Sequence, residues 1–132
     1  MTESAPIRVL VVDDHAAVRS SIVRLFSRYQ DLNVTGEAFD GSQVLDMAKQ
    51  GDFDLVLLDI SMPGKNGLDV LRELKHELPQ LPVIMLSIHS REEYRSQAMA
   101  LGASAYVAKD RAAEDLIGVV RRITKRGAPP AV

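Results

Sequence analysis

The sequence has no cysteine, no long apolar run and no large excess of charge of either sign. Without cysteine the chain can form neither a disulfide nor a thiolate metal site, so the fold depends on packing alone. Sixteen Lys and Arg residues against eighteen Asp and Glu residues give a net charge of −2, which argues against the basic surface typical of nucleic-acid-binding domains. No apolar run approaches the ~18 residues of a membrane span, and the first six residues lack the basic and then apolar order of a signal peptide. We therefore expect a cytoplasmic protein without membrane contact.

The remaining composition is typical of one globular domain, with 46% hydrophobic and 26% charged residues in a chain of 132. Short apolar runs rich in β-branched residues alternate with segments whose apolar residues recur at helical spacing. The runs predict strands at 7–12, 32–38, 55–58, 83–86 and 105–107. The periodic segments predict helices at 16–29, 41–50, 68–78, 91–101 and 112–125. Residues 1–6 are interpreted as an N-terminal extension, 7–126 as the domain, and 127–132 as a Pro-rich tail or the start of a linker.

Five repeats of a strand followed by a helix predict an α/β fold with a doubly wound, five-stranded parallel sheet. Each crossover is right-handed, and helices must cover both faces of a sheet that is buried on both sides. Ligands of such sheets bind outside the carboxyl ends of the strands. The residues that directly follow each strand are therefore the first candidates for a functional site.

Charged and polar residues stand at four of these strand ends: Asp13 and Asp14, Asp59, Ser87, and Lys109. Two carboxylates about 4 Å apart repel by ~4 kcal/mol at an effective dielectric constant near 20. Three such pairs would rival the whole stability of a domain, which is ~5–15 kcal/mol, so the cluster needs counter-ions. Lys109 supplies one positive charge. Mg²⁺ fits best for the rest, because it binds carboxylates while keeping waters that phosphate oxygens can replace.

Carboxylates beside Mg²⁺, an ammonium group and a hydroxyl form an arrangement suited to phosphoryl transfer onto a carboxylate. Lys109 would neutralise charge on the phosphoryl oxygens, and Ser87 would donate a hydrogen bond to one of them. Charge alone does not decide which carboxylate is the nucleophile. Asp59 is the natural candidate, because it alone has no acidic neighbour in the sequence.

Four segments carry a resemblance to a known family: Val-Val-Asp-Asp-His at 11–15, Leu-Asp-Ile-Ser-Met-Pro-Gly at 58–64, Leu-Ser at 86–87 and Tyr-Val-Ala-Lys at 106–109. Over residues 6–126 the chain resembles the receiver domains of two-component response regulators, the group that includes the chemotaxis protein CheY. The resemblance implies a flavodoxin-like (βα)5 fold with strand order 2-1-3-4-5.

The same resemblance implies a role for each site residue. Asp59 would be the phosphoacceptor, and Lys109 would contact the phosphoryl group. The Mg²⁺ ligands would be Asp13, Asp14, Asp59 and the backbone carbonyl of Ser61. Ser87 and Tyr106 would be the switch residues, and a sensor histidine kinase would be the phosphoryl donor. Such a protein is not a conventional enzyme, because it catalyses only its own phosphorylation and dephosphorylation.

Lys109 is followed by Asp110, whereas many receivers have a proline there in a cis peptide, a bond that would cost ~2.5–4 kcal/mol before aspartate. Together with the Asp-Asp-His and Pro-Gly-Lys-Asn-Gly segments, this resembles the NarL/FixJ-type subgroup, whose members carry a C-terminal helix-turn-helix of the LuxR type. The resemblance implies transcription regulation through a DNA-binding output domain absent from these residues, and possible homodimer formation on phosphorylation.

Two other functions remain open at this point. A stand-alone receiver or adaptor would act through protein contacts alone. A Mg²⁺-dependent phosphatase with an aspartate nucleophile usually needs a general acid two residues after the nucleophile, where this chain has Ser61.

The three histidines show no metal-ligand spacing, and His15 and His76 are interpreted as polar surface residues. His89, two residues after Ser87, is expected to lie at the edge of the site and to modulate hydrolysis of the acyl phosphate.

Overall fold

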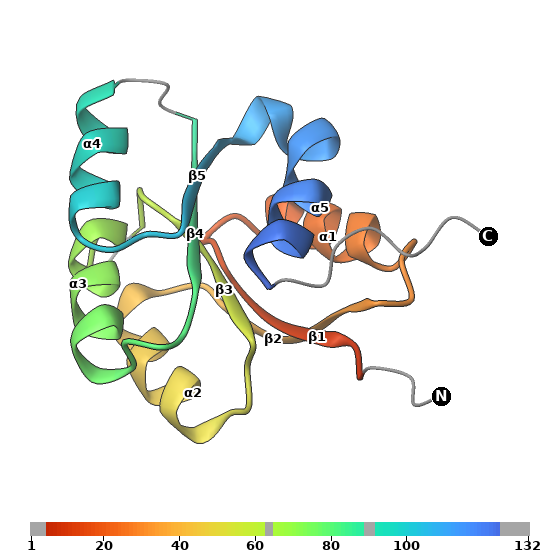
Figure 1. The fold of residues 1–132 in the computed structure, drawn as a ribbon, viewed down its shortest axis with the longest axis horizontal. Coiled ribbons are helices and arrows are strands. Elements are labelled where there is room, and N and C mark those ends of the chain that lie inside the picture. Colours follow the sequence, from red (N-terminus) through yellow and green to blue (C-terminus); the bar gives the residue numbers. More distant parts are fainter. Residues whose placement is uncertain (1–4, 63–64, 89–91, 125–132) are drawn as a thin grey trace.

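The computed structural model describes residues 5–62, 65–88 and 92–124, in which strands and helices alternate along the chain (Figure 1). The strands are β1 (Ile7–Val12), β2 (Leu32–Ala38), β3 (Leu55–Asp59), β4 (Val83–Ser87) and β5 (Ala105–Ala108). The α-helices are α1 (Ala16–Phe26), α2 (Val44–Gln50), α3 (Gly67–Glu77), α4 (Glu92–Ala100) and α5 (Ala112–Ile123). Two short 3₁₀ helices, η1 (Gly41–Gln43) and η2 (Lys109–Arg111), precede α2 and α5.

The five strands form one parallel sheet in the order β2-β1-β3-β4-β5. This confirms both the predicted α/β class and the strand order that the resemblance implied. The order reverses at the junction of β1 and β3, which is where ligands bind in sheets of this kind. The strand ends at this junction therefore position the candidate site.

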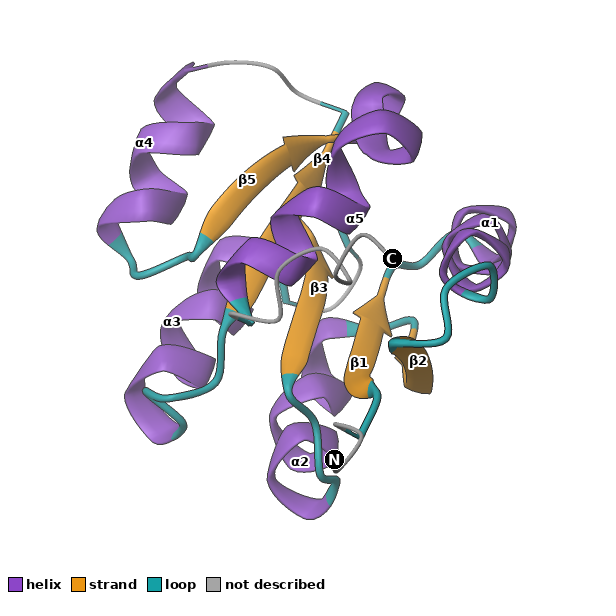
Figure 2. Cartoon of the chain, turned by 45° about the vertical axis from the view of Figure 1, so that its right-hand side comes forward, coloured by secondary structure: helices purple, strands orange, loops and turns teal. Residues whose placement is uncertain are grey.

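Helices cover both faces of the sheet, as Figure 2 shows with the strands lying between the helices. Helices α1 and α5 pack on one face over a cluster that includes Val9, Leu57 and Ile84. Helices α2, α3 and α4 pack on the other face over Leu10, Leu58 and Met85 among others. Successive residues of a strand point to opposite faces, so a continuous apolar strand supplies both clusters.

Two of the predicted helices differ from the structure by three residues at one end. The predicted helix 16–29 ends at Phe26, and Tyr29 lies in the following turn, where its amide donates to the Phe26 carbonyl at 3.0 Å. Tyr29 still contacts α5, because the guanidinium of Arg121 lies 5.1 Å from its ring centroid. The predicted helix 41–50 begins as η1, where the Asp40 carboxylate accepts a hydrogen bond from the amide of Ser42 at 2.8 Å.

Arg121 joins the last turns of α5 to the turn before β2. Its guanidinium donates two hydrogen bonds of 2.9 Å to the carboxylate of Asp31, which is 90 residues away in sequence. The pair is largely shielded from solvent, and it raises the pKa of the guanidinium. This clamp holds the C-terminal part of α5 against the α1 side of the molecule.

The backbone that leads from β5 into α5 is regular. The Lys109–Asp110 peptide bond is trans and begins η2, which leads into α5. Gly102, expected to end the helix at 91–101, has a φ of 104°, a left-handed conformation that glycine adopts without strain. The tail at 127–132 and most of the N-terminal extension lie outside the described residues, so their assignments stay predictions.

Candidate functional site

The sheet register places the predicted site residues at one edge. Val12 pairs with Leu58, so the next residues, Asp13 and Asp59, stand level at the ends of β1 and β3. On the other side of β3, Ser87 is the last residue of β4 and pairs with Ala108, which Lys109 follows. The polar residues therefore meet because each one immediately follows, or ends, a buried parallel strand.

Lys109 joins the two carboxylates. Its Nζ lies 2.7 Å from Oδ2 of Asp13 and 3.2 Å from Oδ1 of Asp59. The side chains of Asp13, Asp59 and Lys109 are only 0%, 4% and 15% exposed. One ammonium group between two carboxylates leaves an excess negative charge in a space that water hardly reaches, where charges interact strongly.

The pKa values of Lys109 and Asp59 reflect this excess. Burial raises the pKa of the Asp59 carboxyl, the charge of Asp13 adds to the rise, and Lys109 opposes it. Burial lowers the pKa of the Lys109 amine, but the carboxylates of Asp13 and Asp59 together outweigh it, so that this pKa is raised. The lysine therefore stays charged, and the cluster still favours additional positive charge.

Asp13 is held in place by the backbone and by Arg19. Its amide donates to the carbonyl of Ala38 at 3.0 Å, and its own carbonyl accepts a 2.6 Å hydrogen bond from Nη1 of Arg19. The guanidinium of Arg19 also contacts Glu37 and lies 5.9 Å from the ring centroid of Phe39. Arg19, which the sequence analysis did not single out, fixes the backbone of Asp13 from α1.

Asp59 is buried, and its two carboxylate oxygens differ in their contacts. Oδ1 contacts Lys109 and accepts a long hydrogen bond from the amide of Ser61 at 3.4 Å. Oδ2 accepts no hydrogen bond from any part of the chain that the structure describes. A buried carboxylate oxygen without a partner costs free energy, and such an atom in a native site calls for an ion or a reacting group.

Gly67 packs the start of α3 against the backbone of Asp59. Its amide donates to the carbonyl of Ile60 at 2.6 Å, and a Cβ on Gly67 would lie 2.2 Å from the carbonyl oxygen of Asp59. Only glycine permits this approach, which fixes the position of the residue that the site depends on.

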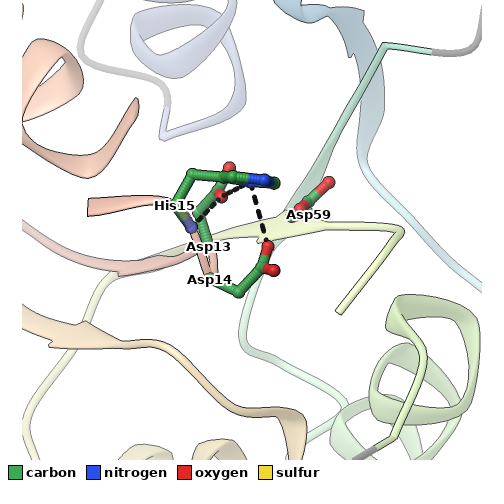
Figure 3. Close-up of side chains that lie close together, drawn as sticks. All are labelled: Asp13, Asp14, His15 and Asp59. Carbon is green, nitrogen blue, oxygen red and sulfur yellow. Dashed lines mark hydrogen bonds and ion pairs between the residues drawn. The ribbon is translucent and has the colours of Figure 1, made fainter. Parts of the chain in front are cut away.

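Asp14 and His15 complete the acidic cluster. Figure 3 shows their side chains beside Asp13 and Asp59, with dashed lines from the His15 ring to two carboxylates. One ligand atom from each of these four residues lies within 4.8 Å of the others. His15 is 66% exposed, which agrees with its interpretation as a polar surface residue, but its ring Nδ1 lies 3.2 Å from Asp13 and 3.1 Å from Asp14. Its position directly after Asp13 and Asp14 was the signal that could have revealed this.

For the other four predicted site residues the structure gives at most their position and burial. Ser87 is buried at the end of β4, and Ser61 is exposed beyond β3. Tyr106 is half-buried in β5 and packs on the side of the sheet that carries α4. His89 lies outside the described residues. The roles expected for these four residues stay predictions.

A flavodoxin-like sheet with a buried acidic cluster at the point where its strand order reverses defines the class of this protein. Within that class, the sequence profile of the response regulator receiver domain matches residues 9–121. The chain therefore belongs to the family of response regulator receiver domains.

Relatives place the chain near the NarL-type regulators. It is 37% identical over 117 residues to the nitrate/nitrite response regulator protein NarL of Escherichia coli K12, which covers 89% of this chain and 54% of NarL. The signal receiver domain of the response regulator NarL from Mycobacterium tuberculosis superposes with a TM-score of 0.87 at 32% identity, covering 92% of this chain and 98% of that domain. The chain thus spans about half the length of the curated relatives it matches.

The second similar structure is a complex with bound ions. The CheX–CheY–BeF₃–Mg²⁺ complex from Borrelia burgdorferi contains a chain that matches with a TM-score of 0.83 at 25% identity, covering 90% of each chain.

None of the helices in the described residues has the length and the apolar character that a membrane span requires.

Proposed function

We propose that this protein accepts a phosphoryl group on Asp59 from a phosphohistidine of a sensor histidine kinase, and that phosphorylation switches its output. One observation carries this proposal: Lys109 bridges Asp13 and Asp59, while Oδ2 of the buried Asp59 has no partner among the described residues. Attack by a carboxylate oxygen of Asp59 on phosphorus forms the acyl phosphate as the bond from phosphorus to the histidine nitrogen breaks. The bonding electron pair stays on that imidazole nitrogen.

The residues present fit a Mg²⁺ ion. Carboxylate oxygens are the ligands that Mg²⁺ prefers, and Asp13, Asp14 and Asp59 bring them within 4.8 Å of one another. The backbone carbonyl of Ser61 would be a further ligand, as in the family. When bound, the ion neutralises charge on the transferred phosphoryl group. The Borrelia relative crystallised with Mg²⁺ and BeF₃ supports the assignment.

The chain's own groups stabilise the reacting phosphoryl oxygens. Lys109 stays protonated and would exchange part of its contact with Asp59 for an ion pair with one phosphoryl oxygen. The hydroxyl of Ser87 would donate a hydrogen bond to another. The added charge of about −2 would draw Ser87 toward it, and the space released would let Tyr106 move inward and change the surface near α4 and β5. His89 would modulate hydrolysis of the acyl phosphate.

The wider function follows the family. The receiver would occupy residues 7–126 and act in the cytoplasm, catalysing only its own phosphorylation and dephosphorylation. Its output would be transcription regulation through a C-terminal DNA-binding domain outside the 132 residues, with a homodimer as one possible active form. The NarL relatives, which extend well beyond the matched region, support this proposal.

Intact-mass spectrometry after incubation with acetyl phosphate and Mg²⁺ tests the proposal. The wild-type chain should gain one phosphoryl group, Asp59→Asn should gain none, and the exposed Asp46→Asn on α2 should behave as wild type. Continuous turnover of a phosphate ester without an adduct would replace the proposal with a phosphatase. A wild-type chain that stays unmodified would favour an adaptor that does not use phosphate.

A further inference from the structure

His15 places a nitrogen atom among the oxygens of the acidic cluster. Its Nδ1 lies 3.2 Å from Oδ1 of Asp13 and 3.1 Å from Oδ1 of Asp14. Figure 3 shows the ring extending over the cluster toward Asp59. Two carboxylate oxygens thus converge on one ring nitrogen, which carries either a single proton or a single lone pair.

These spacings match ligands that share one cation. Neighbouring ligands of an octahedral ion with bonds of about 2.1 Å lie about 3.0 Å apart. The contacts of Nδ1 with Asp13 and Asp14, at 3.2 Å and 3.1 Å, are close to this value. With its proton on Nε2, the ring would direct the Nδ1 lone pair at the same point as the two carboxylates.

A second observation points to a ligand at this position. The side chain of Asp59 is only 4% exposed, and its Oδ2 has no hydrogen-bond partner in the described parts of the chain. Oδ1 of Asp13 already accepts the amide of His15 at 2.9 Å, so the ring contact is not needed to satisfy that oxygen. The cluster therefore offers both an unused oxygen and a spare nitrogen.

Nitrogen changes which cation the site prefers. Mg²⁺ is a hard ion that takes oxygen ligands, whereas imidazole suits divalent first-row transition metals. We propose that His15 Nδ1 is a ligand of the cation site, and that this gives the receiver a preference for a first-row transition-metal ion, such as Co²⁺, over Mg²⁺. The inference rests on the cation site of the proposed function and adds a nitrogen ligand to it.

Calorimetric titration of the 132-residue chain with Co²⁺ and with Mg²⁺ tests the preference. His15→Asn should raise the Kd for Co²⁺ by about tenfold or more, in the range of about 10–100-fold that follows loss of a group supporting a metal site. The Kd for Mg²⁺ should change by less than about twofold. His76→Asn, which alters an 83% exposed histidine in α3, should change neither value.

Proton NMR of the Co²⁺-loaded chain identifies the ligand directly. The wild type and His76→Asn should show hyperfine-shifted imidazole signals that His15→Asn lacks, and far-UV circular dichroism should confirm that all three proteins are folded. Parallel changes in Co²⁺ and Mg²⁺ affinity, or shifted signals that persist in His15→Asn, would overturn the nitrogen ligand while the cation site stands. Failure of the wild type to bind either ion would overturn both.

Discussion

Replacing Gly67 with alanine should damage both the stability of the fold and the reactivity of Asp59. The added Cβ would lie 2.2 Å from the carbonyl oxygen of Asp59 and 2.6 Å from Cα of Ile60, whereas ordinary contact begins at 3.4 Å. The start of α3 and the end of β3 must then separate by about 1 Å. Overpacking of this kind costs ~1–3 kcal/mol, and the upper half of that range applies here because both contacts are backbone atoms.

Urea unfolding followed by far-UV circular dichroism measures the loss. At an m-value of about 2 kcal/mol/M, a loss of 2 kcal/mol lowers the unfolding midpoint by about 1 M. The same displacement moves the Asp59 backbone, and a misplacement of about 1 Å can slow a positioned reaction by about a hundredfold. Phosphorylation by acetyl phosphate, timed by mass spectrometry, should therefore be at least about tenfold slower.

Gly118 in α5 provides the matched control. A Cβ at this exposed position would meet nothing within 4 Å, so Gly118→Ala should gain ~0.5–1 kcal/mol from helix propensity and leave the phosphorylation rate unchanged. A Gly67→Ala midpoint equal to or above that of the wild type would refute the close approach. A loss of stability with a normal phosphorylation rate would refute the link between the packing of α3 and the reactivity of Asp59.

Three further predictions concern charge. Burial raises the pKa of the Asp59 carboxyl above its ordinary 3.8, so the folded state binds that proton more tightly and loses stability as the carboxyl ionises with rising pH. In chelator at pH 7, Asp59→Asn should therefore raise the urea midpoint. If this gain did not shrink as the pH falls toward 3.8, the pKa of Asp59 would not be raised by folding. Mg²⁺ at about 100 times its Kd should stabilise the wild type by ~2.7 kcal/mol in the same assay, whereas Asp14→Asn should raise stability without metal and respond little to it. Arg121→Met should lower the free energy of unfolding by ~1–2 kcal/mol. In a double-mutant cycle with Asp31→Asn, losses of the two single variants that simply add would show that the pair contributes nothing to stability.

The sheet and its functional edge could be predicted because each depends on local patterns. Continuous apolar strands such as 55–58 indicate burial on both faces, and the residue after such a strand must lie at the edge where ligands bind. That reasoning brings Asp13, Asp59 and Lys109 together without knowledge of any side-chain conformation.

Other features could not be read from the sequence, because they depend on how distant segments approach one another. Nothing local pairs Arg121 with Asp31, and the close approach of Gly67 to Asp59 depends on the packing of α3 against β3. The ring of His15 could turn to solvent or to the cluster, and only the local geometry after β1 decides. Tyr29 kept its apolar contact after the helix had ended, so periodicity alone placed the end of α1 three residues too late.

The sheet backbone divides the buried hydrophobic side chains of the described residues into two compartments that have no residue in common. Leu57 and Leu58 are neighbours in β3, but Leu57 packs with the α1 and α5 side and Leu58 with the α2, α3 and α4 side. A void opened in one compartment cannot be filled by side chains of the other, so destabilising changes in the two should combine additively. Each layer of helices can therefore change in sequence as long as the volume of the cluster beneath it is kept. Substitutions under α1 and α5 should leave the packing beneath Tyr106 unchanged.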